Sequence, residues 1–316
     1  MTVIVNPSER DLRECLRLAG VDPAVVTGVR KIPGEASARS FFRLRVKGAS
    51  RVAMVYPQPA EEEIERIVRL TGVYLRHGVR VPQIEATLGP RGLLLEDAGT
   101  DSFQTSFRRA DRPGKRRLLD GTAELLDRLR RIGPENTGTA LDRMRVEYEM
   151  GFFIAHFAAP VVGEEAARGL RQALLEFLAP LPAPRVFAHR DFHSRNLVIC
   201  GDRLTLVDFQ DSLRAPPLYD LVSLAFDSYL DLGAKRPWLL ERLRAHGWDI
   251  DPEVLALTAL ERNVKALGTF GFQVRVRGHR AYARYVPRTL RHVRGHLARL
   301  RPGAPIADFF ARDWEI

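Results

Sequence analysis

The segment HRDFHSRNLVI occupies residues 189–199, and LVDFQD follows it at residues 206–211. Asp191 and Asn196 stand five positions apart, so one tight loop can present both side chains at the same point. Asp208 lies twelve positions beyond Asn196, which is the distance that a chain needs to run out one strand, turn and return. The spacing predicts that these three side chains meet at one end of a hairpin.

Two carboxylates and an amide in this arrangement are typical of phosphoryl transfer. That reaction needs one carboxylate to orient the attacking hydroxyl, and an oxygen ligand with a second carboxylate to hold Mg²⁺ on the nucleotide phosphates. A single Asp near a turn is usually only a solvated turn residue. Here several residue types stand at fixed offsets, and Asp220 follows in a helix start, PPLYDL. We therefore interpret residues 189–211 as a catalytic segment.

The surrounding sequence predicts two regions of different structure. Phe42, Leu44 and Val46 alternate with charged residues, which is typical of a half-buried strand. Other strands are predicted at 52–56, 80–87 and 92–96, and helices at 8–19, with Ser8 as cap, and 61–77. Beyond residues 96–102 the pattern is mostly helical, apart from two short strands that flank Gly201-Asp202. We predict an α+β chain with a small sheet-rich lobe, residues 1–98, and a larger helical lobe, residues 99–316.

The composition limits the classes of partner. The chain has 316 residues, 45% of them hydrophobic, so it can bury a sizeable core. Its net charge of +10 comes from 44 arginines and five lysines spread over the whole length, without the dense basic run of a nucleic-acid arm. The two cysteines, Cys15 and Cys200, cannot build a disulfide framework or a zinc site. No signal peptide or membrane span is evident. The prediction is a cytoplasmic protein that binds neither nucleic acid nor membrane.

Three motifs resemble a known family: HRDFHSRNL (189–197), DFQDS (208–212) and YDLVSL (219–224). They are similar to the aminoglycoside phosphotransferase superfamily of small-molecule kinases. His193 favours that family over protein kinases, whose loop usually carries a cation or a proline two residues after the catalytic Asp. The resemblance is closer still to bacterial kinases that phosphorylate the anomeric hydroxyl of N-acetylmuramate and N-acetylglucosamine in peptidoglycan recycling. It extends to GEASARSFFRL (34–44) and LLLEDAG (93–99).

The resemblance implies a bilobal protein-kinase-like fold, with ATP and Mg²⁺ as cofactors and a small amino sugar as acceptor. Asp191 would be the catalytic base or hydroxyl-orienting residue, and Asn196 and Asp208 would be the Mg²⁺ ligands. The residues expected to bind ATP are Gly34, Ser37 and Ser40 in a hairpin over the phosphates, and Glu96, Asp97 and Ala98 in a connector at the adenine edge. The residues expected to contact the acceptor are His193, Gln210, Asp211 and Glu149.

The sequence departs from this family on one strand. Kinases of this fold place a lysine on the third strand, where it grips the α- and β-phosphates. The corresponding stretch, residues 52–56, has no cation. Either Arg43, Arg45 or Lys47 on the neighbouring strand substitutes for it, or Mg²⁺ carries more of the charge.

Two other functions stay open at this point. One is a kinase with another acceptor, such as an aminoglycoside, choline or homoserine. A pocket for a polycationic aminoglycoside should be rich in acids, and a net charge of +10 argues against it. The other is a non-catalytic nucleotide-binding protein of the same fold, against which the complete set of Asp191, Asn196 and Asp208 argues.

Overall fold

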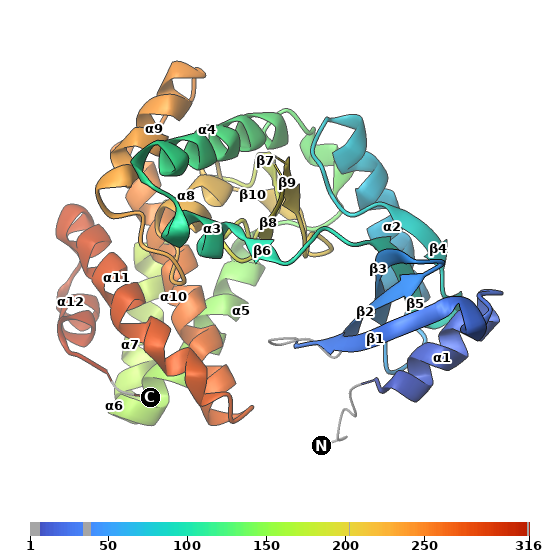
Figure 1. The fold of residues 1–316 in the computed structure, drawn as a ribbon. Coiled ribbons are helices and arrows are strands. Elements are labelled where there is room, and N and C mark those ends of the chain that lie inside the picture. The colour runs from blue at the N-terminus through green and yellow to red at the C-terminus, as the bar shows by residue number, and fades with distance from the viewer. Residues whose placement is uncertain (1–6, 34–38, 202, 315) are drawn as a thin grey trace. The chain divides into compact units, whose positions relative to one another are not determined.

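A computed structural model of the chain describes residues 7–33, 39–201, 203–314 and 316, with Pro23 described by its backbone alone. The chain divides into two compact units, which are described separately (Figure 1). Unit 1 comprises residues 1–101 and 198–210, and unit 2 comprises residues 102–197 and 211–316. The hairpin region 198–210 thus groups with the N-terminal part of the chain. The predicted lobe boundary at residue 98 stays a prediction.

Unit 1 is built on an antiparallel sheet of five strands in the order β1-β2-β3-β5-β4 (Figure 1). The predicted alternation holds in β2, where Phe42 and Leu44 are buried and Arg45 is exposed. The strands are β1 (Val26–Ile32), β2 (Ser40–Val46), β3 (Ala49–Val55), β4 (Ile84–Thr87) and β5 (Gly92–Glu96).

Helices α1 (Glu9–Leu18) and α2 (Glu61–Arg76) complete the N-terminal part of unit 1. Ser8 caps α1, because its hydroxyl accepts from the backbone N–H of Asp11 while the Asp11 carboxylate accepts from the Ser8 backbone. The predicted cap is confirmed. The apolar face of α1 packs in one cluster with side chains of β2 and β3: Leu12, Cys15, Leu16, Phe42, Leu44, Ala53 and Val55.

The predicted hairpin around Gly201 is confirmed. Strands β8 (Leu197–Cys200) and β9 (Arg203–Leu206) pair with each other, and β6 (Asp101–Ser102) lies on the other side of β8. The backbone N–H of Leu206 donates to the Arg80 carbonyl at 2.9 Å, which ties β9 to the rest of unit 1.

Two sequence-based predictions about strands were incomplete. The strand predicted at 80–87 begins only at Ile84, since Pro82 has no N–H to pair with a neighbour. Strand β1 was not predicted, because its exposure does not follow a two-residue period. The antiparallel pair β7 (Val186–Ala188) and β10 (Leu213–Ala215) in unit 2 is too short to give a pattern.

Unit 2 is mostly helical, as predicted. None of the helices in the described part of the chain is long and apolar enough to cross a membrane. The helices are α3 (Phe103–Arg109), α4 (Arg112–Leu129), α5 (Arg143–Phe153), α6 (Ala159–Val162), α7 (Glu164–Phe177), α8 (Tyr219–Ala225), α9 (Arg236–Ala245), α10 (Pro252–Arg275), α11 (Val286–Leu300) and α12 (Ala304–Ala311).

Helix α10 runs through the core of unit 2 and contacts α5, α8 and α11 (Figure 1). A π-helical turn, Ile154–Ala158, continues α5 and approaches α10 at two glycines. A Cβ on Gly268 would lie 2.7 Å from the Phe153 Cα, and a Cβ on Gly271 would lie 2.2 Å from the His156 carbonyl oxygen. Only glycine allows the two backbones to come this close. This contact fixes the position of α10, which carries part of the candidate site.

Candidate active site

The predicted catalytic loop begins directly after β7. Two buried carboxylates accept hydrogen bonds from its backbone. Asp220, at the start of α8, accepts the backbone N–H of His189 at 2.7 Å and that of Arg190 at 3.0 Å. Asp227 accepts the backbone N–H of Ser194 at 2.8 Å. Arg190 has a φ of +79°, so the chain turns sharply just before Asp191. The loop backbone is therefore fixed on both sides of Asp191.

Asp191 and Asn196 meet within this loop, as their spacing predicts. The Asn196 amide Nδ2 donates to the Asp191 carbonyl at 3.0 Å, and the Asn196 backbone N–H donates to the His193 carbonyl at 3.0 Å. The amide is thus fixed through its nitrogen, and its oxygen Oδ1 is the atom suited to a cation. Phe192, fully buried, anchors the loop between them.

The Asp191 carboxylate faces a lysine from another element. Nζ of Lys265, on α10, lies 3.4 Å from Oδ1 of Asp191. The Asp191 side chain is 32% exposed and that of Lys265 is 16% exposed. Burial opposes ionisation of Asp191, but the charges of Lys265 and Arg190 outweigh it and hold the pKa of Asp191 well below its usual range. A carboxylate of this kind orients a hydroxyl strongly and takes its proton only late in the reaction.

A second ion pair supports the loop from α5. Glu149 is only 4% exposed, and its Oε1 accepts from Nη2 of Arg190 at 2.9 Å. Burial and the neighbouring Glu149 raise the pKa of Glu261 on α10 well above its usual range. No hydrogen-bond donor reaches Oε2 of Glu149 or either carboxyl oxygen of Glu261 in the described structure. The two carboxyl groups therefore hold one proton between them. This burial disfavours the predicted direct contact of Glu149 with the acceptor.

The other residues of unit 2 that are predicted to contact the acceptor substrate, His193 and Asp211, lie in different environments. Burial lowers the pKa of His193 to about 3, so the imidazole is neutral, and it stacks edge-on against Tyr229 at 4.9 Å. The guanidinium of Arg195 lies 4.2 Å from the centre of the Tyr229 ring. Asp211 is exposed. His193 and Asp211 remain predicted acceptor contacts.

Asp208 lies in unit 1, just beyond β9, with a φ of +63°. Its Oδ1 accepts from Nε2 of Gln210 at 3.0 Å and from Nη2 of Arg39 at 3.3 Å. The next residue, Phe209, packs its ring edge-on against Tyr74 of α2 at 5.3 Å. These contacts orient the Asp208 carboxylate and also engage Gln210, which the sequence predicts as an acceptor contact.

Two of the three cations considered as substitutes for the third-strand lysine have other partners. Arg43 forms a two-bond ion pair with Asp97, at 2.8 and 2.9 Å, and also donates to the Gly99 carbonyl. Arg45 donates to the Gly48 carbonyl at 3.2 Å. Lys47 lies in the β2–β3 turn with a φ of +49°. Arg39, which the sequence reasoning missed, contacts both Asp208 and the Met54 sulfur of β3, at 3.9 Å.

The connector at the end of β5 is held by ion pairs. Arg80 pairs with Glu96, and the Glu96 backbone N–H donates to the Gln83 carbonyl at 2.8 Å. The pKa of Asp97 is lowered: burial opposes ionisation, but hydrogen bonds from Arg43 and Ser50 outweigh it. Ala98 is half-buried. The predicted adenine contact of Glu96, Asp97 and Ala98 stays a prediction.

The predicted phosphate hairpin lies mostly outside the described residues, because Gly34 and Ser37 are not among them. Ser40 is described. It is 3% exposed, and its hydroxyl donates to the Pro7 carbonyl at 3.0 Å. This bond disfavours the predicted contact between the Ser40 hydroxyl and a phosphate.

The donor set suits a hard cation, since Mg²⁺ prefers carboxylate and amide oxygens. Asn196 and Asp208 offer such oxygens, in unit 2 and unit 1 respectively. Within the described ranges, no three His, Cys, Asp or Glu side chains gather at one point as a separate metal centre. The assignment of Asn196 and Asp208 to Mg²⁺ stays a prediction.

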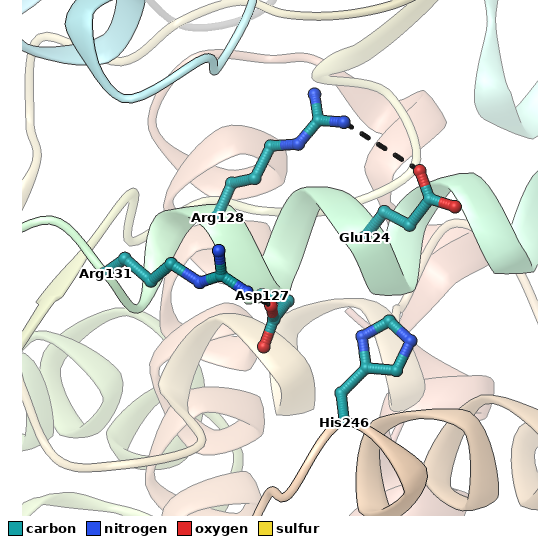
Figure 2. A pocket seen from close by; sticks show the side chains of 5 residues that line it. All are labelled: Glu124, Asp127, Arg128, Arg131 and His246. Carbon is teal, nitrogen blue, oxygen red and sulfur yellow. Dashed lines mark hydrogen bonds and ion pairs between the residues drawn. The ribbon is translucent and has the colours of Figure 1, made fainter.

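A cavity of about 330 Å³ opens elsewhere on unit 2 (Figure 2). Its walls come from α4 and the end of α9, and its lining residues are Glu124, Asp127, Arg128, Arg131 and His246. Asp127 accepts from Trp248 Nε1 at 3.2 Å and pairs with Arg131 at 2.5 Å. The acids of this cavity are paired with its own arginines, and it contains none of the predicted site residues.

Sequence reasoning missed three charged side chains that shape the site. Lys265 and Glu261 lie on a helix that matches no motif, and Arg39 is one arginine among 44. The spacing of four between Glu261 and Lys265 puts both on one face of α10. That spacing was the only sequence signal for a shared role of Glu261 and Lys265, and it does not indicate which residues this face of α10 contacts.

Comparisons with known proteins show the family of the chain. A model of the phosphotransferase enzyme family matches residues 28–257. The N-acetylmuramate/N-acetylglucosamine kinase of Neisseria meningitidis serogroup B is 28% identical over 296 residues, which covers 86% of each chain. The N-acetylmuramate/N-acetylglucosamine kinase of Pseudomonas aeruginosa is 27% identical over 297 residues, covering 88% of this chain and 86% of that relative.

A solved structure extends the likeness to the fold. The choline kinase LicA from Streptococcus pneumoniae superposes with a TM-score of 0.64 at 15% identity, covering 92% of this chain and all of that one. The α+β, kinase-like fold predicted from the sequence is confirmed.

Proposed function

Because the chain belongs to the phosphotransferase enzyme family, a group of enzymes that transfer phosphoryl groups to small molecules, we propose that it transfers the γ-phosphoryl group of ATP to an N-acetyl amino sugar. The acceptor atom is the anomeric hydroxyl of N-acetylmuramate, N-acetylglucosamine or a close analogue. The observation that carries the proposal is the half-exposed Asp191 carboxylate, presented with Asn196 on a loop that Asp220 and Asp227 hold rigid.

In this proposal Asp191 orients the anomeric hydroxyl and accepts its proton. An anomeric hydroxyl is more acidic than an ordinary alcohol, so a carboxylate with a lowered pKa suffices. Asn196 and Asp208 hold Mg²⁺, which neutralises charge on the ATP phosphates when it is bound. The acceptor is contacted by His193, Gln210 and Asp211. The amino-sugar choice is supported by two relatives of that name, at 27% and 28% identity over most of the chain.

The nucleotide side of the proposal rests on unit 1. Arg39 replaces the third-strand lysine, since its guanidinium reaches both β3 and the Asp208 carboxylate. An arginine can bind two phosphate oxygens at once, which a lysine cannot. Backbone groups at residues 96–98 meet the adenine edge.

An acceptor panel tests the proposal. Release of ADP from ATP and Mg²⁺ is measured with N-acetylmuramate, N-acetylglucosamine, aminoglycosides, choline and homoserine. We expect turnover with the free N-acetyl sugars and none with their methyl glycosides, which lack the anomeric hydroxyl. Asp191→Asn should lower kcat by about 10²–10⁴ while the melting temperature and ADP binding stay near wild type. Turnover of aminoglycosides or small alcohols, but of no N-acetyl sugar, would overturn the acceptor assignment.

A further inference from the structure

The arginine next to Asp191 in the catalytic loop, Arg190, is already paired with Glu149 at 2.9 Å. Two residues beyond Asp191, where the loop of protein kinases usually carries a cation, this chain has His193. A second positive charge reaches Asp191 from another element. Lys265, in the middle of α10, places Nζ 3.4 Å from Oδ1 of Asp191.

Lys265 lies on a largely buried stretch of α10 and keeps part of its side chain exposed. Its side chain is 16% exposed, while Val264, Arg262 and Glu261 on the same helix are buried. α10 also packs closely against the π-helical turn at Gly271, where an added Cβ would lie 2.2 Å from the His156 carbonyl oxygen. A residue held in this way has a defined reach, which a surface lysine lacks.

The charge of Lys265 also helps to lower the pKa of Glu149, but its ion pair is with Asp191. Glu149 is paired with Arg190 at 2.9 Å, and Glu261 shares a proton with Glu149. Asp191 is the one carboxylate that pairs with Lys265 in the described part of the chain. An ammonium group has three N–H donors, and one is enough for this pair. The other two are available to an anion that approaches Asp191.

The reaction brings such an anion to this place. The hydroxyl that Asp191 orients must lie about 3–3.5 Å from the phosphorus that it attacks. The three equatorial oxygens of the transferring group carry negative charge, and the Asp191 carboxylate adds more. A cation 3.4 Å from that carboxylate is within reach of one of these oxygens.

We propose that Lys265 is a catalytic residue that binds an equatorial oxygen of the transferring phosphoryl group. In this step a bond forms between the acceptor oxygen and the γ-phosphorus, and the bond from that phosphorus to the bridging oxygen of ADP breaks. The acceptor proton passes to Asp191, and Lys265 keeps its own protons throughout. The inference rests on the proposed use of ATP, but not on the identity of the acceptor.

Kinetics of Lys265→Met and Lys265→Arg provide the first test. Lys265→Met keeps the apolar stem and removes the charge, and should lower kcat by about 10²–10³, as for loss of one donor to a developing anion. The KM values for ATP and acceptor should stay within about threefold, since the contact strengthens only in the transition state. Lys265→Arg should restore part of kcat. Arg275→Met, at the exposed end of the same helix, is the control and should behave as wild type.

Binding of a transition-state mimic separates a contact with the phosphoryl group from mere positioning of Asp191. ADP with aluminium fluoride and Mg²⁺ should bind wild type and Asp191→Asn more tightly than ADP alone. Lys265→Met should lose most of this difference. Equal behaviour of Lys265→Met and wild type in this assay would overturn the proposal, and Lys265→Gln provides the same comparison through a second variant.

Slow hydrolysis of ATP by water distinguishes this inference from the proposed function. If wild type phosphorylates no amino sugar, but its hydrolysis of ATP falls in Lys265→Met, the acceptor assignment fails and the role of Lys265 stands. If wild type phosphorylates amino sugars and Lys265→Met keeps kcat within threefold, the proposed function stands and the role of Lys265 fails.

Discussion

The proposed function assigns phosphate binding to Arg39, which contacts Asp208 in unit 1. If Arg39 grips the phosphates, Arg39→Ala should raise the KM for ATP by about tenfold or more, since a hydrogen bond to a charged group contributes about 1.5–3 kcal/mol. The KM for the acceptor should stay within about threefold. Steady-state kinetics with either substrate varied would measure both values.

Arg45→Ala is the matched control. Arg45 lies in β2, the strand that begins directly after Arg39, and it donates to a backbone carbonyl of the β2–β3 turn. It should leave the KM for ATP unchanged. A larger effect of Arg45→Ala or Arg43→Ala than of Arg39→Ala would return the phosphate contact to the cations that the sequence first indicated.

Because Glu149 and Glu261 share a proton, two similar substitutions should differ in how much they lower the free energy of unfolding. Glu261→Gln keeps a hydrogen-bond donor toward Glu149 and should change the free energy of unfolding by less than about 1 kcal/mol. Glu149→Gln removes the charge that pairs with the buried Arg190 and should cost about 3 kcal/mol or more. Urea unfolding of both variants measures the difference. A greater loss for Glu261→Gln would mean that Glu261 is ionised.

At the residue scale the sequence predicted the loop and missed its support. Asp191 and Asn196 were found because their spacing within one loop is short and fixed. Lys265 lies 74 positions beyond Asp191, and such a contact depends on how α10 packs, which no local pattern encodes. Glu149 was expected to contact the acceptor because of the family resemblance, and no sequence pattern indicated its burial or its bond to Arg190.

At the scale of elements, the approach of α10 to the π-helical turn makes Gly271 sensitive. Gly271→Ala would place a methyl group 2.2 Å from the His156 carbonyl oxygen, so one of the two backbones must move. We expect a loss of about 1–3 kcal/mol in the free energy of unfolding, as for other overpacked sites. Because α10 also carries Lys265, kcat should fall as well.

The control for this substitution is Gly295→Ala on α11, where an added Cβ meets nothing within 4 Å. Alanine is the better helix former by about 1 kcal/mol, so this variant should be as stable as wild type or more stable. Thermal melting of both variants is the measurement. Equal stability of Gly271→Ala and Gly295→Ala would contradict the tight contact.

Elements with a strong pattern were the predictable ones. The Ser8 cap and the apolar face predicted helix α1, and the alternation of apolar and charged residues predicted β2. Strand β1 lacks that alternation, since its exposed residues come in pairs. The π-helical turn packs against glycines of α10 that lie far along the chain, and no local pattern indicates that contact.

At the scale of the whole molecule, buried histidines should make the fold sensitive to acid. Burial lowers the pKa of His292 to about 4 and that of His296 to about 3. The folded state keeps both neutral, whereas the unfolded chain takes up protons below about pH 6.5. The contribution of the two neutral histidines to the free energy of unfolding is therefore fully present above pH 6.5 and is lost as the pH falls toward 4. At pH 5 each histidine costs about 2 kcal/mol.

The measurement is the difference between two proteins, because buried acids such as Asp220, whose pKa is raised to about 7 by burial, change stability in the opposite direction. His296→Gln cannot be charged and can still donate to the side-chain oxygen Oδ1 of Asn263, which lies 3.1 Å from Nε2 of His296. Between pH 7.5 and 5, this variant should lose about 2 kcal/mol less than wild type in urea unfolding. Equal losses would show that His296 is not held neutral.

The proposed function requires that the anomeric oxygen of the sugar receives the phosphoryl group. The direct measurement is the phosphorus-31 NMR spectrum, with proton correlation, of the product formed from ATP and N-acetylglucosamine or N-acetylmuramate. We expect a phosphomonoester signal whose phosphorus couples to the anomeric proton, because Asp191 orients the hydroxyl at that carbon. Coupling instead to the protons at C6 or at another ring carbon would contradict the account.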